Sequence, residues 1–263
     1  MIRFLFVLIF ITNQVSALEL KGTFEQGSLI IGKTNPSNEI YVDQKKLKVS
    51  KEGYFIFGIS RDRKKNIIIS INKDNKAREV IKVVKSRKFK VQKIDGLPKR
   101  KVSPNDEDMK RIRKEGKLIA KAKNVNSDLS FFFKDFIRPV DGITTGVFGS
   151  QRVLNGKPRR PHYGIDFHAP EGTPVKAMMD GEVTLAENDM YFTGGTIIFD
   201  HGHGISTLYM HMKDIDVKVG QKIKQGQIVG TLGQSGRATG PHLDIRLNWF
   251  DVKLDPATIL NSN

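Results

Sequence analysis

The sequence predicts a mainly β protein, with two β-rich parts and one helical segment between them. Three observations support this prediction. Short runs of β-branched and aromatic residues recur about every ten positions in the first third of the 263 residues. A stretch rich in Lys, Arg, Glu, Ala and Leu follows, and a long glycine-rich region with further apolar runs completes the chain. A chain of this length ordinarily contains more than one domain.

The N-terminus has the pattern of a signal peptide. Arg3 precedes eight apolar residues, 4–11, and polar residues follow them directly. Val15 and Ala17 then place small side chains at the two positions that a signal peptidase reads. A membrane anchor would need roughly 20 apolar residues, so we expect residues 1–17 to be removed and the chain to be exported to the periplasm or cell envelope.

Residues 18–97 are predicted to form a small, basic, β-sandwich-like domain. Asn, Pro, Gly and Lys separate its apolar runs, as is typical of antiparallel strands joined by short turns. The five predicted strands cover residues 28–32, 39–42, 53–58, 66–71 and 79–84. No catalytic motif is visible in this part.

Residues 98–130 are predicted to be a helical linker, with one helix over about 103–124. Ser103-Pro104 and three acids, at 106–108, stand where a helix N-terminus favours them. Residues 131–263 are again β-rich, and their many glycines predict tight turns within a bent antiparallel sheet.

Charge and histidine are segregated along the chain. The formal net charge is +16, and residues 1–130 hold 30 Lys and Arg against 14 Asp and Glu, whereas residues 131–263 hold 14 against 14. A basic exported domain is predicted to attract an anionic envelope polymer or a membrane surface. The alternative is that these charged side chains only keep the surface of the domain soluble. We expect no nucleic acid partner, because no nucleic-acid-binding motif is present.

The absence of cysteine excludes disulfides, Cys-ligated zinc and a thiol nucleophile, so chemistry must come from His, Asp and Glu. All six histidines lie in the second part of the chain. In extended backbone, residues two or four apart share a face. Three polar pairs have this spacing: His162 and Asp166, Tyr209 and His211, and His242 and Asp244. One such pair is usually structural, but three in one domain favour a metal site.

The three pairs and their surroundings resemble the lysostaphin-like or LytM-type zinc endopeptidases. That family carries an HxxxD element, a Tyr-x-His element and a late HxH element that follows Gly-Pro. The corresponding segments here are His162…Asp166, Tyr209-Met210-His211 and Gly240-Pro241-His242-Leu243-Asp244. The resemblance covers roughly residues 138–260 and includes the glycine turns between these elements.

The resemblance implies a bent antiparallel β-sheet peptidase domain with one zinc ion, held by His162, Asp166 and Asp244 and with a fourth position open to water. One position departs from the family, because its last ligand is a histidine and this chain has Asp244. A carboxylate oxygen is an acceptable zinc ligand. Its extra negative charge weakens the metal as a Lewis acid, so we expect lower activity than in a His-ligated relative.

The resemblance also implies that His211 and His242 are catalytic histidines outside the ligand set. They would orient the attacking water and stabilise or protonate the tetrahedral intermediate. Tyr209 is a candidate substrate-binding residue, as is Arg160, whose Gly/Pro loop directly precedes His162. The remaining histidines are expected to be structural or exposed: His168, His201 and His203.

Three functions stay open at this point. The first is an exported, monomeric endopeptidase that hydrolyses peptide cross-links between peptidoglycan stem peptides. The second is a catalytically weak or inactive wall-binding regulator that activates an amidase, as relatives with lost ligands do; here four of the five key positions are unchanged. The third is a lipoyl or biotinyl carrier, because residues 219–230 resemble its strands, but the required lysine motif is missing.

Overall fold

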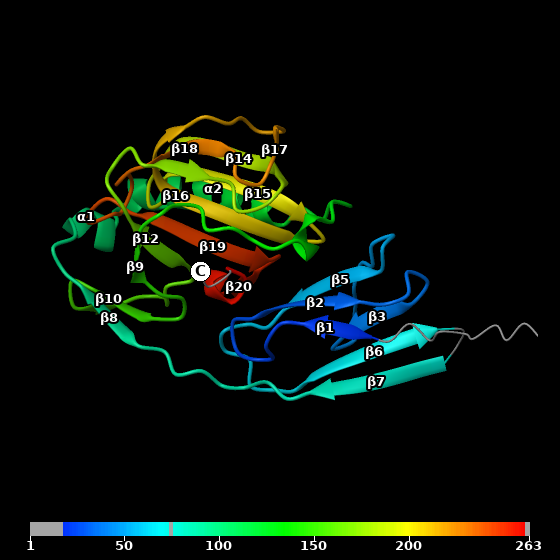
Figure 1. The fold of residues 1–263 in the computed structure, drawn as a ribbon. Coiled ribbons are helices and arrows are strands. Elements are labelled where there is room, and N and C mark those ends of the chain that lie inside the picture. The colour runs from blue at the N-terminus through cyan, green and yellow to red at the C-terminus, as the bar shows by residue number, and fades with distance from the viewer. Residues whose placement is uncertain (1–17, 74–75, 261–263) are drawn as a thin grey trace, which may run out of the picture.

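The computed structural model describes residues 18–73 and 76–260, and the predicted signal peptide, residues 1–17, lies outside the described residues. Figure 1 shows two small sheets from the first part of the chain beside one large, bent sheet from the second part. The prediction of a mainly β protein with small N-terminal sheets, one long helix and a large antiparallel C-terminal sheet is confirmed.

The first part of the chain forms two antiparallel sheets. One has three strands: β1 (Glu19–Lys21), β2 (Leu29–Lys33) and β5 (Tyr54–Gly58). The other has four: β4 (Lys45–Lys46), β3 (Glu39–Val42), β6 (Ile67–Lys73) and β7 (Lys76–Lys82). Ile30 and Phe55 from the first sheet and Ile40 and Ile69 from the second are fully buried in one hydrophobic core. Burial of these side chains is the main stabilising contribution to the two sheets.

The chain then passes close to the second part before it becomes helical. Strand β8 (Val91–Ile94) pairs in parallel with β10 (Gln151–Leu154), which forms a hairpin with β11 (Lys157–Pro158). Asn155 and Gly156 both have positive φ angles, 46° and 75°, as a tight two-residue hairpin turn requires. A segment that follows the N-terminal sheets therefore lies beside a hairpin of the C-terminal region (Figure 1).

Two helices follow, α1 (Lys99–Val102) and α2 (Asp106–Lys123). The side chain of Asn105 caps α2 by accepting a hydrogen bond from the Asp108 amide at 2.9 Å. The helix packs on strands of the large sheet, where Ala122 joins a buried apolar cluster. Within residues 18–73 and 76–260, neither helix has the length and apolar character that a membrane span requires.

The large sheet has ten antiparallel strands. They are β9 (Ile143–Gly146), β12 (Ile165–His168), β13 (Pro174–Lys176), β14 (Gly181–Met190), β15 (Gly194–Gly202), β16 (Ile205–Ile215), β17 (Lys222–Ile223), β18 (Ile228–Leu232), β19 (Leu243–Trp249) and β20 (Val252–Leu254). Register shifts in five of the strand pairings bend the sheet strongly. Two 3₁₀ turns flank it, η1 (Phe131–Phe133) and η2 (Pro256–Thr258).

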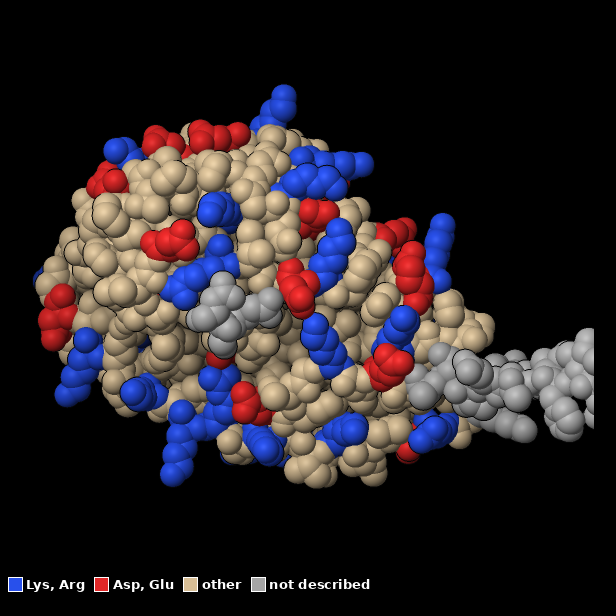
Figure 2. Space-filling view, viewed as in Figure 1, with Lys and Arg blue, Asp and Glu red and all other residues tan. Residues whose placement is uncertain are grey.

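Both faces of the large sheet are covered. All nine residues of β15 are buried, because α2 packs on one face and the main hydrophobic core lies on the other. Figure 2 shows Lys and Arg spread over the face seen in Figure 1, with acidic side chains between them. The basic charge of the chain is therefore distributed on this face and is not gathered into a single patch.

Candidate active site

Three metal-competent side chains meet at two neighbouring strands of the large sheet, β12 and β19. Asp166 on β12 lies directly opposite Asp244 on β19 in the antiparallel register, so both carboxylates stand in one cross-strand row. His162 lies in the loop before β12, four residues ahead of Asp166. Each residue offers one ligand atom, and these atoms all lie within 4.8 Å of one another. All three residues are buried.

Two glycines leave the space that the carboxylates occupy. Gly146 of β9 is the cross-strand neighbour of Asp166, and a Cβ atom added there would lie 2.1 Å from Asp166 Oδ2. A Cβ atom on Gly164 would lie 2.3 Å from Asp244 Oδ1. These contacts are far too short for any side chain, so glycine is required at both positions for reasons of space.

Three candidate ligand atoms, on His162 and Asp166, lack the hydrogen bonds that buried polar atoms normally make. His162 Nε2 lies 3.0 Å from Asp166 Oδ1, and His162 Nδ1 lies 3.9 Å from Asp244 Oδ2. Nevertheless both ring nitrogens and Asp166 Oδ1 have no hydrogen-bond partner within the described part of the chain. Unsatisfied buried polar atoms are costly. A zinc ion takes nitrogen and oxygen ligands of this kind, so the residues present fit a metal ion.

Two arginines balance the charge of the carboxylates. Arg152 Nη2 donates to Asp166 Oδ2 at 2.8 Å, and Arg246 Nη2 donates to Asp244 Oδ2 at 3.1 Å. Burial alone would raise the pKa of Asp244, but the positive charges around it, that of Arg246 foremost, outweigh burial and hold this pKa below its usual range. Asp244 is therefore ionised at neutral pH and available as a ligand.

His211 and His242 lie at the edge of this cluster with their ring centroids 4.7 Å apart. His211 Nδ1 donates to the Ser235 carbonyl at 2.8 Å, and His242 Nδ1 donates to the Gly240 carbonyl at 2.9 Å. These bonds fix the tautomer of each neutral ring, so that each Nε2 presents a lone pair. Burial lowers the pKa of His211 to about 4, and the neighbouring His242 adds to this effect. His211 is thus a neutral base at pH 7.

The backbone of His211 has a φ angle of 65°, which is uncommon outside glycine. Side chains alternate only while a strand stays extended, so this conformation breaks the alternation that was predicted for Tyr209 and His211. The side chain of His211 reaches the site, whereas that of Tyr209 is fully buried in the core. The Tyr209 hydroxyl accepts the Met178 N–H at 2.8 Å, and burial raises the pKa of Tyr209. In this position Tyr209 does not belong to the residues that line the two cavities beside the cluster.

The other histidines take three different positions. His201 belongs to β15 and lies in the core, whereas the sequence pattern favours a turn for it. His168 is exposed, and its Nδ1 donates to the Pro241 carbonyl at 2.7 Å. His201 is fully satisfied in the core by the Asp180 carbonyl and the Thr207 hydroxyl, both at 2.8 Å. His203 lies in the turn after β15, at a φ angle of 50°.

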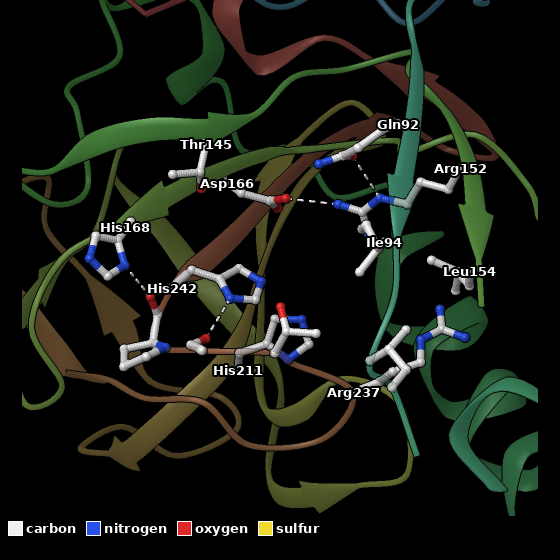
Figure 3. A pocket seen from close by; sticks show the side chains of 14 residues that line it. Gln92, Ile94, Thr145, Arg152, Leu154, Asp166, His168, His211, Arg237 and His242 are labelled. Atoms are coloured by element: carbon white, nitrogen blue, oxygen red, sulfur yellow. Dashed lines mark hydrogen bonds and ion pairs between the residues drawn. The ribbon is translucent and has the colours of Figure 1, made fainter. Parts of the chain in front are cut away.

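Two cavities open onto the cluster. The first, about 260 Å³, is lined by Asp166, His211 and His242, and β8 contributes Gln92 and Ile94 to its opposite wall (Figure 3). Figure 3 also shows Arg152 between Gln92 and Asp166; its Nε donates to Gln92 Oε1 at 3.3 Å. The N-terminal region therefore supplies part of the wall around the site.

The second cavity, about 580 Å³, is lined by His162, Asp244 and His211 and by the exposed Arg160. The sequence analysis did not identify Arg152 or Arg246 as site residues. The spacing of Arg246, two residues after Asp244 on the same strand, is a signal that could have found it. No comparable local signal exists for Arg152, which comes from a separate hairpin.

Known proteins resemble the domain that holds this cluster. Residues 160–256 match the profile of Peptidase family M23. The peptidoglycan DD-endopeptidase ShyA of Vibrio cholerae is 45% identical over 87 residues, which are 33% of this chain and 20% of ShyA. The DD-carboxypeptidase/endopeptidase Mpg of Neisseria gonorrhoeae is 38% identical over 100 residues, which are 38% of this chain and 23% of Mpg. The chain thus spans only about a quarter of these curated relatives or less.

A solved structure matches nearly the whole chain. The crystal structure of a putative peptidase M23 from Pseudomonas aeruginosa aligns with a TM-score of 0.70 and 28% sequence identity. The alignment covers 90% of this chain and 95% of that chain. The likeness therefore includes the arrangement of the N-terminal sheets as well as the large sheet.

Proposed function

We propose that this chain, which belongs to peptidase family M23 through residues 160–256, is a metal-dependent endopeptidase that hydrolyses peptide cross-links of bacterial peptidoglycan. The observation that carries the proposal is the buried cluster of His162, Asp166 and Asp244, in which both His162 nitrogens and Asp166 Oδ1 have no hydrogen-bond partner among the described residues. The relatives named peptidoglycan DD-endopeptidases support the substrate class.

His162, Asp166 and Asp244 would hold one zinc ion. When bound, zinc supplies Lewis acidity toward a carbonyl and lowers the pKa of a coordinated water. The chain itself supplies the proton transfers. The Nε2 lone pairs of His211 and His242 face the same region, so either ring is placed to accept a proton from the attacking water and return it to the leaving amine.

Arg152 and Arg246 have supporting roles in this proposal. Each fixes the orientation of one carboxylate by a charge-assisted hydrogen bond. Arg246 also offsets the extra negative charge that Asp244 brings to a position where the family carries a histidine. Arg160 remains a candidate substrate contact, because it is exposed at the rim of the second cavity.

The test is incubation of the purified protein with isolated wall sacculi, with and without a chelator, followed by analysis of the released muropeptides. We expect release of muropeptides that chelator abolishes and added zinc restores. His162→Ala should remove both zinc and activity. Lys218→Ala, which changes an exposed side chain of the same domain that lines neither cavity, is the control and should keep both. Release that persists at full rate in chelator would contradict the proposal.

One observation favours a second candidate, a weak or inactive regulator that activates an amidase. Both carboxylates of the cluster are already paired with arginines, which partly satisfies them without a metal. Stimulation of an amidase, without any cleavage of sacculi by this chain, would support the regulator over the peptidase.

We further propose that the chain is exported and acts in the periplasm or envelope as a monomer. Relatives named peptidoglycan DD-endopeptidases, such as ShyA of Vibrio cholerae, support the envelope location, because peptidoglycan is the wall polymer. The proposed division is a signal peptide, 1–17, a basic β domain, 18–97, a helical linker, 98–130, and a peptidase domain, 131–263. The basic domain would bind an anionic envelope polymer or membrane surface, and cosedimentation with anionic vesicles or sacculi tests this.

A further inference from the structure

The second cavity of the site is strongly basic. Six cationic side chains line this basic chamber: Arg152, Arg159, Arg160, Arg237, Arg246 and Lys253. Asp244 is the one carboxylate among the described residues that line it. An excess of like charges around one cavity is unfavourable unless an anion compensates it. The balance of charge within the chamber therefore points to an anionic ligand.

Arg237 is a half-buried lining arginine without a charged partner in the described part of the chain. Arg159 and Arg160 also have no ion pair among the described residues, but Arg159 donates to the Val102 carbonyl and Arg160 is exposed. Arg152 and Arg246 are paired with the carboxylates of the cluster, whereas no ion pair or side-chain hydrogen bond of Arg237 occurs among residues 18–73 and 76–260. Its guanidinium carbon lies 4.4 Å from the ring centroid of Phe192, which holds the side chain in place. Arg237 is thus a half-buried, positioned cation whose donors are free.

The electrostatic environment of Arg237 is unusual for an arginine. Burial, together with the charges of neighbouring arginines, Arg152 first among them, lowers the pKa of Arg237 to about 10. Lys253 at the same cavity is affected in the same way: burial, together with the charges of Lys123 and Arg246, lowers its pKa to about 7. A bound anion would relieve this repulsion at both side chains.

The position of Arg237 relates the anion to the reaction. Arg237 and His211 each line both cavities, so a group bound by Arg237 lies next to the proposed acid–base histidines. The rest of the chamber wall includes apolar side chains, among them Leu154, Phe192 and Met210. A peptide with small apolar side chains and a carboxylate near the scissile bond suits such a wall, and a planar guanidinium can bind a carboxylate through two hydrogen bonds.

We propose that the basic chamber is a subsite for a free carboxylate of the peptide substrate, with Arg237 as its principal contact. This inference rests on the proposed function in one respect, because it takes the substrate to be a peptide. It assigns the specificity of the site to peptides that carry a carboxylate next to the bond that is cut.

The first experiment measures binding without catalysis. The mature full-length chain is titrated with acetyl-dialanine and with its C-terminal amide, which has the same shape without the charge, and binding is followed by NMR or calorimetry. We expect the acid to bind about tenfold to a hundredfold more tightly than the amide, the range of a charge-assisted hydrogen bond. Arg237→Gln should bring this ratio close to one, and Arg237→Lys should restore part of it. Arg113→Gln, an exposed arginine of α2, is the control and should keep the ratio.

Equal binding of acid and amide by the wild type would overturn the inference, as would an unchanged ratio in Arg237→Gln with a native melting temperature. Inorganic phosphate distinguishes the other source of anionic chemistry. Phosphate binding that is tighter than that of the acid and is lost in Arg237→Gln would make the chamber a phosphate site and would also overturn the carboxylate assignment.

The second experiment separates this inference from the proposed function. Cross-linked muropeptides with free carboxylates and the same muropeptides after amidation are compared as substrates. We expect a higher kcat/KM for the free carboxylates, and a loss of this preference in Arg237→Gln. Acid-selective binding without hydrolysis of any substrate would refute the peptidase and retain the subsite. Hydrolysis of both substrates at equal kcat/KM would refute the subsite and retain the peptidase.

Discussion

Replacing Arg246 with Met is expected to destabilise the metal-free protein by about 2–3 kcal/mol. The substitution keeps an apolar chain of similar length but leaves Asp244 as a buried carboxylate without its main counter-charge. Removing one partner of a fully buried ion pair costs about 3–5 kcal/mol. The side chain of Arg246 is 29% exposed while that of Asp244 is only 2% exposed, and one of their two contacts is long, at 3.4 Å, so the expected cost lies at or below the lower end of that range.

Zinc should reverse part of this loss. In the wild type a metal must share the oxygens of Asp244 with Arg246, whereas in the variant no hydrogen bond from residue 246 competes for them. Zinc should therefore raise the free energy of unfolding of the variant more than that of the wild type, by about 1 kcal/mol or more.

The assay is urea denaturation of both proteins, once in chelator and once in excess zinc, with Arg113→Met as the control for loss of a positive charge at the surface. A variant within about 0.5 kcal/mol of the wild type in chelator would refute the role of Arg246 as counter-charge. Equal stabilisation of variant and wild type by zinc would refute Asp244 as a ligand.

Three further predictions follow from the same region and its core. Burial lowers the pKa of His201 from 6.5 to about 4, so between these pH values the unfolded chain binds more protons than the folded chain. The free energy of unfolding should therefore fall by up to roughly 3 kcal/mol as pH falls from 6.5 to 4. In His201→Gln, urea denaturation should show a smaller dependence of this free energy on pH. Asp244→His should retain zinc and raise kcat/KM on muropeptides by no more than about tenfold, because a neutral imidazole leaves the metal a stronger Lewis acid; lost activity with zinc retained would count against the ligand assignment. Gly146→Ala should displace Asp166 and lower zinc affinity by at least about tenfold, measured by competition with a chromophoric chelator, while Gly116→Ala, which meets no atom within 4 Å, should not.

The sequence predicted the elements of this fold where local pattern decides the structure. Ile67–Lys73 and Tyr54–Gly58 are dense in β-branched and aromatic side chains, and each becomes a strand with a buried face. Helix α2 has acids in its first turn and a partial apolar stripe, and it was predicted within a few residues. The residue that caps the helix is Asn105, two positions after the predicted start at Ser103. A sequence pattern locates the ends of a helix only to within one or two residues.

The site was predictable only in part, because its geometry depends on contacts across strands. The opposition of Asp166 and Asp244 comes from the register of β12 and β19, which residue spacing within one strand does not determine. Alternation also placed Tyr209 with His211, and the positive φ angle of His211 separates them. The neighbourhood of Arg237 and Arg152 arises from segments more than 80 residues apart in the chain, so no local pattern contains it.

Asp244 and Arg246 are best understood as a unit. A carboxylate that already shares its charge with a guanidinium presents less negative charge to a metal than a free carboxylate does. The pair of Asp244 with Arg246 therefore approaches the neutral character of the histidine that the family carries at this position. This limits the loss of Lewis acidity that Asp244 alone would cause, which is why the gain expected from Asp244→His is modest. It also means that Asp244→His leaves Arg246 without a partner, so that its cationic side chain would join Arg237 in the basic chamber and strengthen the attraction for an anionic substrate.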